Sequence, residues 1–173
     1  MPFERDRPLL QQECAGDPWK VFAACILLTQ TQRKQVDEVW DKVMLYWPSP
    51  EIMAEASLAE VAGVLTSNGL SWVKAYRLIR MSHEYLSWDG EDDPTTIFGV
   101  GEYGRDAYAI FVSGALEFEP RDKELAAFLE SLPYRCVNDT DGDGDCPNCG
   151  PGRRPQTVDF IPICKRRYIP DGQ

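Results

Sequence analysis

The chain has 173 residues and a mass of 19.6 kDa, which fits one ordinary domain, or one domain with a small appendage, and excludes large multidomain machinery. Its 43% apolar and 11% aromatic residues exclude a disordered chain, and no uninterrupted apolar run approaches the roughly 20 residues of a membrane span. The 18 basic residues against 28 acidic ones give a formal net charge of −10, which excludes nucleic-acid binding through a large basic footprint.

The N-terminal residues MPFERDRPLL lack the basic and then apolar layout of a secretory signal. We therefore expect an intracellular location in a reducing compartment, where the six cysteines are first interpreted as thiols or metal ligands rather than as disulfides. A chain this acidic can still bind phosphates through backbone amides and a few cations at defined positions. We then expect non-specific binding to be weak and its affinity to depend only slightly on salt concentration.

The first half of the chain predicts a series of short helices. Asp17 and Pro18 combine an N-cap residue with proline at the first helical position, and the WKVFAACILL that follows is apolar on nearly every side, so we expect a central, buried helix. After a break at residues 29–32, apolar residues recur at helical spacing until Pro48 ends the helix.

Two further helices follow in the sequence. Residues from Ser57 to Glu60 have the spacing of a capping box, and Asn68-Gly69 is typical of a left-handed C-cap that ends the helix. The next helix is expected over about residues 72–86. Its helical spacing places on one stripe Trp72, Ala75, Tyr76, Ile79 and His83. For His83, the only histidine, a surface or packing role outweighs general-base catalysis.

From Thr95 the chain reads TTIFGVGEYGRDAYAIF, a short apolar lead, a Gly99-Val100-Gly101 hairpin and a new helix. The glycines permit a tight turn and leave backbone amides at the N-terminus of the next helix, where an anion such as a phosphate can bind without any base being read. Taken alone, the same pattern also fits a simple corner between two helices. A last helix is predicted to start near Asp122 and to cover KELAAFLESL.

Composition changes abruptly after Pro133. We therefore predict an all-α body over residues 1–134 and a short, loop-rich tail over residues 135–173 that has too little apolar content to fold unaided. The four cysteines of this tail are spaced C-x9-C-x2-C-x14-C and are Cys136, Cys146, Cys149 and Cys164. The inner pair has the form of a zinc knuckle, and all four could complete a four-thiolate Zn²⁺ site whose binding energy orders the tail. An iron–sulfur cluster ([4Fe-4S]), or free thiols or disulfides, are the alternatives.

Two charged segments accompany these cysteines, one between Cys136 and Cys146 and one directly after Cys164. The acidic residues Asp139, Asp141 and Asp143, followed by Gly144, resemble the first half of a calcium-binding EF-hand loop. The second half does not match such a loop, because its twelfth position is Gly150 rather than a bidentate Glu. A solvated acidic loop is therefore favoured over a calcium site. A basic run near the C-terminus can supply phosphate contacts that the acidic body lacks, or it is a solvated run of charge. It consists of Lys165, Arg166 and Arg167.

Four segments, in this order, resemble the helix-hairpin-helix (HhH-GPD) DNA glycosylase superfamily: DPWKVFAACILLTQTQ, SNGLSWVKAYRL, FGVGEYGRDAYAIF and EPRDKEL. Within it, the segments are most similar to the mismatch-specific thymine glycosylases that occur linked to a methyl-CpG-binding domain. The resemblance covers roughly residues 17–130. It implies an all-helical fold, DNA as the substrate, flipping of a base out of the duplex, and hydrolysis of its N-glycosidic bond.

The resemblance also assigns chemistry to individual residues. Asp122 matches the catalytic aspartate, whose carboxylate would stabilise the positive charge that develops on the sugar and orient a water; an Asp at this place is also a favoured N-cap. Tyr103 falls where the bifunctional lyases carry a lysine that forms a Schiff base with the sugar, and a phenol cannot form that imine. Lys74 and Lys123 remain as possible amines, but neither occupies the matching position. Tyr103 is expected to contact the flipped pyrimidine, the alternative being an aromatic ring packed against the hairpin.

The resemblance places DNA contacts at two loops. Gln30 aligns with the loop from which family members push a side chain into the gap left by the flipped base, with Thr29, Thr31 and Gln32 beside it; the alternative is a polar loop that caps helices. The hairpin over residues 99–104 is the expected clamp on the DNA backbone. Its glycines are Gly99, Gly101 and Gly104.

The tail departs from the family. Endonuclease III-like members also end in four cysteines, but with x6, x2, x5 spacing and with several helices between the catalytic aspartate and the cluster. Here only 13 residues separate Asp122 from Cys136. We therefore expect the second helical subdomain to be missing or rebuilt.

The sequence thus predicts a monofunctional DNA glycosylase that excises a mismatched, damaged or modified pyrimidine, with thymine or uracil opposite guanine as the first candidate substrates. The alternatives are an enzyme that flips a modified pyrimidine and transfers a group without excision, and a non-catalytic DNA-binding adaptor. Double-stranded DNA is the expected partner, no membrane is involved, and the chain is expected to be monomeric and associated with DNA in the cytoplasm, nucleoid or nucleus.

Overall fold

The computed structural model describes residues 8–115, 118–131, 145–146 and 150–151. The chain divides into two compact units, one over Glu4–Ser113 and the other over Gly114–Gln173 together with Met1–Phe3. Within the described residues, no helix has both the length and the apolar character to span a bilayer.

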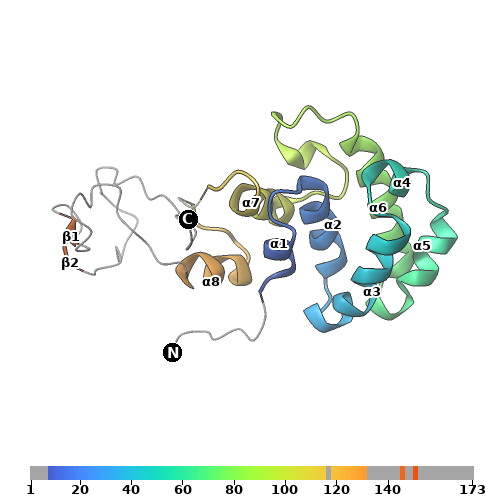
Figure 1. Ribbon diagram of the computed structural model, residues 1–173, viewed down its shortest axis with the longest axis horizontal. Coiled ribbons are helices and arrows are strands. Elements are labelled where there is room, and N and C mark those ends of the chain that lie inside the picture. Colours follow the sequence, from blue (N-terminus) through green and yellow to red (C-terminus); the bar gives the residue numbers. More distant parts are fainter. Residues whose placement is uncertain (1–7, 116–117, 132–144, 147–149, 152–173) are drawn as a thin grey trace. The chain divides into compact units, whose positions relative to one another are not determined.

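The first unit is entirely helical in its described part (Figure 1). Its helices are α1 (Leu10–Glu13), α2 (Pro18–Leu28), α3 (Arg33–Tyr46), α4 (Pro50–Ala54), α5 (Leu58–Val64), α6 (Ser71–Tyr85) and α7 (Glu102–Phe111), with 3-10 turns η1 (Thr66–Asn68) and η2 (Pro94–Thr96). The second unit holds α8 (Lys123–Ser131) and an antiparallel ribbon of two short strands, β1 (Asp145–Cys146) and β2 (Gly150–Pro151). The all-helical body expected from the sequence is confirmed.

Helix α2 is the central helix of the first unit, as predicted. Asp17 caps it, because its Oδ1 accepts a hydrogen bond from the backbone N–H of Lys20 at 3.1 Å, and Pro18 occupies the first turn. The helix packs against α1, α3, α6 and α7 (Figure 1). Its buried side chains are those of Trp19, Val21, Phe22, Ala23, Ala24, Cys25, Ile26 and Leu27.

Helix α3 also follows its prediction. Val36, Val39 and Val43 recur at helical spacing and are buried, and the helix ends at Tyr46, two residues before Pro48. The second proline does more than stop this helix, because Pro50 stands at the start of α4. A proline is tolerated there, since the first-turn N–H groups of a helix have no partner within the helix.

The turn between α5 and α6 differs in detail from the prediction. Ser57 is the N-cap of α5, but its side chain makes no capping hydrogen bond within the described structure, so the capping box to Glu60 is not formed. Asn68 ends η1, and Gly69, its C-cap, has the expected positive φ of 72°; the next residue, Leu70, also has a positive φ of 50°, whereas Asn68 does not. Leu70 is the N-cap of α6.

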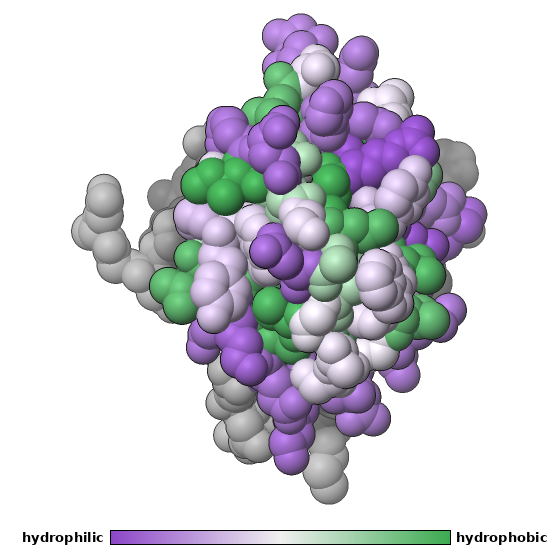
Figure 2. All heavy atoms as spheres, turned by 90° about the vertical axis from the view of Figure 1, so that its right-hand side faces the viewer, coloured by the Kyte–Doolittle hydropathy of each residue, from purple (hydrophilic) through white to green (hydrophobic). Residues whose placement is uncertain are grey.

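The stripe that helical spacing marks on α6 is not its buried face: only Ala75 is buried, and Ile79 is half-buried. The residues that α6 buries are Lys74, Ala75, Leu78, Met81 and Ser82, whereas Trp72, Tyr76 and His83 are exposed. Hydrophobic spacing misses this face because two of its members are polar and are satisfied by partners on other elements. Large apolar side chains therefore reach the surface, and on the face in Figure 2 apolar groups lie between hydrophilic ones.

The second unit contains the last predicted helix, α8. Asp122 precedes it, and its Oδ1 accepts hydrogen bonds from the backbone N–H groups of Glu124 (2.9 Å) and Leu125 (3.0 Å). Leu125 and Leu129 are its buried side chains. The predicted helix start at Asp122 is confirmed.

Candidate active site

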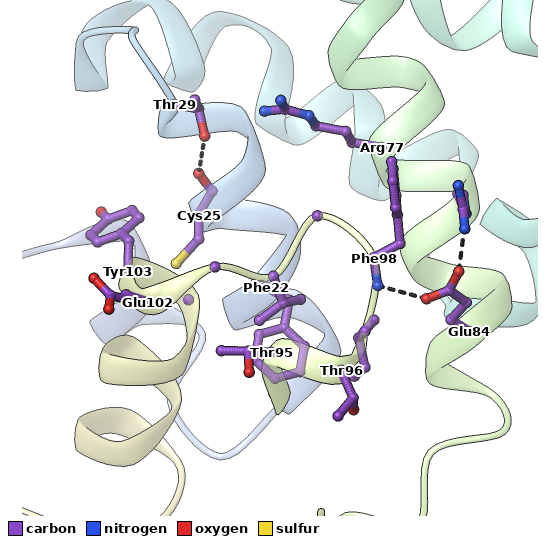
Figure 3. Close-up of a pocket in the computed structure, with 16 residues that line it drawn as sticks. Phe22, Cys25, Thr29, Arg77, Glu84, Thr95, Thr96, Phe98, Glu102 and Tyr103 are labelled. Atoms are coloured by element: carbon purple, nitrogen blue, oxygen red, sulfur yellow. Dashed lines mark hydrogen bonds and ion pairs between the residues drawn. The ribbon is translucent and has the colours of Figure 1, made fainter. Parts of the chain in front are cut away.

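A cavity of about 810 Å³ opens beside the Gly99-Val100-Gly101 hairpin in the first unit (Figure 3). Its walls come from α2, α6, η2, the hairpin and the first turn of α7. Thr29, Tyr103 and the three glycines of the hairpin segment, all singled out in the sequence, line it together. Phe22, Cys25 and Arg77 are lining residues that the sequence did not assign to a site.

The hairpin is a tight turn that leads directly into α7. Gly99 has a φ of 83°, a region that L side chains rarely adopt, and Val100 N–H donates to Ile97 O at 3.1 Å. The first helical hydrogen bond of α7 runs from Arg105 N–H to Gly101 O at 3.0 Å, so the turn over residues 102–104 is the N-terminal end of the helix. This end lines the cavity, where its dipole favours an anion.

Glu84 ties the start of the hairpin to α6. Its carboxylate accepts a hydrogen bond from Phe98 N–H at 2.6 Å and pairs with Arg80 at 3.0 Å, as the dashed lines in Figure 3 show. The Arg80 guanidinium also lies 3.9 Å from the centroid of the Phe98 ring, a cation–π contact. From the same helix, Arg77 extends its guanidinium over the cavity (Figure 3). The lining of the cavity thus includes both a cation and a helix N-terminus.

A buried glutamine lies behind Tyr103. Gln11 of α1 is 0% exposed, and its Nε2 donates to the Tyr103 hydroxyl and lies 3.8 Å from the Sγ of Cys25. Its Oε1 is buried and has no hydrogen-bond partner among the described residues. A buried, unpaired carbonyl costs about 1–3 kcal/mol. Gln11 itself does not line the cavity, so a ligand there reaches this oxygen only when the neighbouring side chains move.

Sequence reasoning missed Gln11 for two reasons. It lies in PLLQQECAG, and α1 is only four residues long, so no periodicity marks one of its glutamines as buried. Its partner, Tyr103, is 92 residues away in the chain, and a contact at that separation leaves no local pattern. Tyr103 itself was predicted, and the structure places its ring at the edge of the cavity (Figure 3).

The predicted wedge loop connects α2 to α3. Gln30 is exposed and has a φ of 53°, an uncommon conformation for a residue that is not glycine. Thr31 Oγ1 lies 3.1 Å from Thr29 O and 3.0 Å from Asn68 O, each an acceptor for its hydroxyl. Gln32 is the N-cap of α3, and its N–H donates to Gln35 Oε1 at 3.4 Å. The loop therefore does cap a helix, and it also presents Gln30 to solvent.

Lys74 is buried beneath this loop, with 1% of its surface exposed. Its Nζ donates to Leu27 O (2.7 Å), Asn68 Oδ1 (2.7 Å), Asn68 O (3.2 Å) and the Thr31 hydroxyl. Burial, with a smaller contribution from the charge of Arg77, lowers the pKa of Lys74 to about 8. The amine is enclosed by protein oxygens, so it is not an exposed nucleophile.

Asp122 belongs to the second unit, as the residue before α8. Its Oδ1 serves as the helix cap, whereas Oδ2 accepts no hydrogen bond in the described part of the chain. One carboxylate can therefore hold the start of the helix with one oxygen and leave the other for chemistry. The capping role and the predicted catalytic role are compatible.

Most of the predicted tail site lies outside the described residues. This holds for Cys136, Cys149 and Cys164, for the acidic residues from Asp139 to Asp143, and for Lys165, Arg166 and Arg167. Cys146 stands in β1, of which only the backbone is described. Over the described ranges, no group of three or more His, Cys, Asp or Glu side chains could hold a metal ion.

Comparisons with known proteins agree with this architecture. Residues 23–158 match the family model described as HhH-GPD superfamily base excision DNA repair protein. The chain is 32% identical over 130 residues to a methyl-CpG-binding domain protein 4-like protein of Arabidopsis thaliana, covering 73% of this chain and 28% of that protein. It is 31% identical over 120 residues to a thymine/uracil-DNA glycosylase of Pyrobaculum aerophilum, covering 66% of this chain and 51% of that enzyme.

Solved structures share the fold. A thermostable thymine-DNA glycosylase superposes with a TM-score of 0.56 at 23% identity, covering 63% of this chain and 53% of that one. Endonuclease III in a non-covalent complex with DNA superposes with a TM-score of 0.51 at 20% identity, covering 62% and 53%. The chain spans about half the length of the archaeal glycosylase and of these structures. The family model covers most of the sequence, and the chain therefore belongs to the HhH-GPD superfamily of base excision DNA repair proteins.

Proposed function

We propose that this chain is a DNA glycosylase that flips a mismatched, damaged or modified pyrimidine out of double-stranded DNA and hydrolyses its N-glycosidic bond. The observation that carries the proposal is the cavity beside the glycine hairpin, bordered by Tyr103, in a chain of the base excision repair superfamily. Double-stranded DNA is the proposed partner, and we expect a monomer to suffice because all the proposed roles fall within one chain.

The DNA backbone would be held at the hairpin. The N-terminal turn of α7 and the guanidinium of Arg77 both line the cavity, and a helix N-terminus and an arginine are two groups that bind phosphate oxygens in proteins. Neither reads a base, so this contact would fix the position of the duplex without selecting its sequence. Because the chain has a net charge of −10, it would bind DNA phosphates through a few donors at defined positions rather than through a large basic surface.

Asp122 is the proposed catalytic carboxylate. When the bond between base and sugar breaks, positive charge develops on the sugar, and an ionised carboxylate beside it stabilises that charge and orients the attacking water. Oδ2, which no described group binds, is the oxygen available for this task. We place Asp122 in this role because it matches the catalytic aspartate of the superfamily motif.

Thymine or uracil opposite guanine is the proposed substrate. Both bases carry an N3–H donor, which cytosine lacks, and the unpaired Oε1 of Gln11 is a buried acceptor next to Tyr103. A buried acceptor left without a partner discriminates strongly against a ligand that lacks the matching donor. The name of the relative from Pyrobaculum aerophilum, a thymine/uracil-DNA glycosylase, supports the same substrate class.

We propose that the enzyme releases the base without cutting the strand. A lyase step needs an amine that forms an imine with the sugar, and Tyr103 occupies the position of that amine in the bifunctional members. Lys74 is enclosed by Leu27, Thr31 and Asn68. The product is therefore an abasic site in an intact strand.

The test is incubation with labelled duplexes that hold T:G, U:G or T:A pairs, followed by heating in alkali. We expect strand breaks at T:G or U:G only after the alkali step. Breaks without alkali would contradict the absence of lyase activity. No abasic product on any duplex would contradict the glycosylase itself; a mass change in the strand would then identify group transfer, and unaltered bound DNA would identify an adaptor.

A further inference from the structure

The buried cation of the first unit, Lys74, lies beneath the loop over residues 29–32. Lys74 of α6 contacts oxygens from three separate segments: Leu27 near the end of α2, Thr31 in the loop over residues 29–32, and Asn68 at the end of η1. In sequence these partners lie 47, 43 and 6 residues from Lys74. The Lys74 ammonium thus links the end of α2, the loop over residues 29–32 and η1.

The ammonium matches the electrostatics of this junction. The last carbonyl groups of a helix have no partner within the helix and carry its negative dipole end, which lysine side chains can cap. Leu27 O is such a carbonyl of α2, and Asn68 O occupies the equivalent place in η1. Asn68 is wholly buried, and its Nδ2 has no partner within the described residues while its Oδ1 accepts from Lys74. The amide is thus oriented to bind the cation.

Gln30 needs such support. Its left-handed backbone costs about 1–2 kcal/mol for a residue with a Cβ, and its exposed side chain makes no hydrogen bond in the described structure that could hold it. The next residue, Thr31, is held from both sides, because its hydroxyl is within hydrogen-bonding distance of Thr29 O and Asn68 O and accepts from Lys74. The strained turn is therefore fixed by the residue that follows it.

We propose that Lys74 is a positioning residue for Gln30: it holds the loop over residues 29–32 in the conformation that presents the Gln30 side chain to the gap left by a flipped base. The proposal rests on the proposed function, in which the duplex is opened at the target. Lys74 does not touch DNA in this role and acts through Thr31. The lowered pKa of Lys74 reflects the burial of this amine, which disfavours its charged form.

The test separates extrusion of the base from the chemistry. Lys74→Met keeps an unbranched apolar stem but removes the donors. We expect the single-turnover rate on mismatched duplex to fall by about ten-fold or more, equal to about 1.4 kcal/mol. On a single-stranded oligonucleotide containing uracil, where no gap has to be filled, we expect the rate to stay within about two-fold of that of the unaltered protein.

Two variants keep the test decisive if Lys74→Met folds poorly. Thr31→Val removes only the hydroxyl that Lys74 contacts, and it should reproduce the loss on duplex with the single-strand rate intact. Gln30→Ala should do the same, and combining it with Lys74→Met should add little further loss, because both changes disable the same step. Additive losses would overturn the proposal.

Ser82→Ala is the matched control. Ser82 lies on the same helix and is equally buried, but it bonds Trp19 Nε1 (2.8 Å) and Leu78 O (2.7 Å) rather than the loop. We expect it to lower the melting temperature without changing the ratio of duplex to single-strand rates. An altered ratio in Ser82→Ala, or an unaltered ratio in Lys74→Met, would show that burial on α6 alone explains the effect.

A readout without excision distinguishes this inference from the proposed function. With 2-aminopurine beside the mismatch, emission rises when the neighbouring base leaves the stack. We expect the rise with the unaltered protein and a smaller rise with Lys74→Met and with Thr31→Val. A rise without any abasic product would contradict the proposed function and leave the loop role supported. An equal rise with all three proteins, or none with any, would overturn the inference.

Discussion

At the scale of single residues, two glycines of the hairpin segment meet different surroundings. A Cβ on Gly104 would lie 2.9 Å from Val100 Cγ1, with a Phe22 ring carbon 3.9 Å away, whereas a Cβ on Gly101 would meet nothing within 4 Å. We expect Gly104→Ala to lower the free energy of unfolding by about 1–3 kcal/mol through overpacking, as measured by urea denaturation. Gly101→Ala is the control for overpacking; because Gly101 is the N-cap of α7, where alanine is less favourable than glycine, we expect a small loss, below that of Gly104→Ala. Equal losses would contradict this account of the packing.

Gln11 gives a second prediction, because its replacement should affect activity far more than stability. Gln11→Leu removes an unpaired buried oxygen but also the hydrogen bond from Nε2 to the Tyr103 hydroxyl, so the two effects oppose each other and we expect little net change in the free energy of unfolding. The excision rate on U:G duplex should fall by about ten-fold or more, since the acceptor for N3–H is gone. Gln12→Leu, at the exposed neighbour on the same helix, is the control for both measurements. Unaltered excision by Gln11→Leu would exclude a role in reading the base.

At the scale of elements, local signals predicted the helices that carry clear caps. Asp17-Pro18, the apolar spacing up to Trp47 and the Asp122 start all correspond to observed helices. The buried face of α6 and the partners of Gln11 could not be predicted in this way. They depend on hydrogen bonds between residues far apart in the chain, such as Lys74 with Leu27, 47 residues away. Such contacts form only once the helices pack.

The cap of α2 allows a direct test at this scale. Asp17→Ala removes the Oδ1 that accepts a hydrogen bond from Lys20 N–H. It also removes the ion pair between Asp17 and Lys20 at 3.2 Å, which contributes little to stability because both side chains are exposed to solvent. We expect a loss of about 1 kcal/mol in unfolding free energy. Asp17→Asn, which keeps an acceptor, should recover most of it. A loss that Asp17→Asn does not recover would show that the charge, rather than the cap, stabilises the helix.

At the scale of the whole molecule, the residues proposed for function are divided between the two units. The hairpin, its cavity and the loop over residues 29–32 all lie in the first unit, whereas Asp122 lies in the second. The sequence predicted the hairpin and Asp122 because each belongs to a contiguous motif. For the tail, the cysteine spacing remains a prediction of a Zn²⁺ site that orders a segment poor in apolar residues.

Metal analysis tests the tail prediction. We expect one equivalent of zinc in the purified chain and no absorbance near 400 nm, because zinc thiolates are colourless whereas iron–sulfur clusters absorb there. Chelation should then lower the stability of the tail without abolishing the helical signal of the body, since no metal group is found among the described residues of that body. Protein free of both metals would remove the four-cysteine site, and a brown, iron-containing protein would favour the cluster.

The catalytic role of Asp122 is tested most directly by comparing the single-turnover excision rates of Asp122→Asn and of the unaltered chain. Both are measured on the duplex that the unaltered chain processes fastest. Asparagine can still cap α8 through its side-chain oxygen but carries no charge to stabilise the sugar cation. We predict unchanged affinity for the duplex and excision reduced by at least about a thousand-fold. Excision by Asp122→Asn at the rate of the unaltered chain would contradict the account.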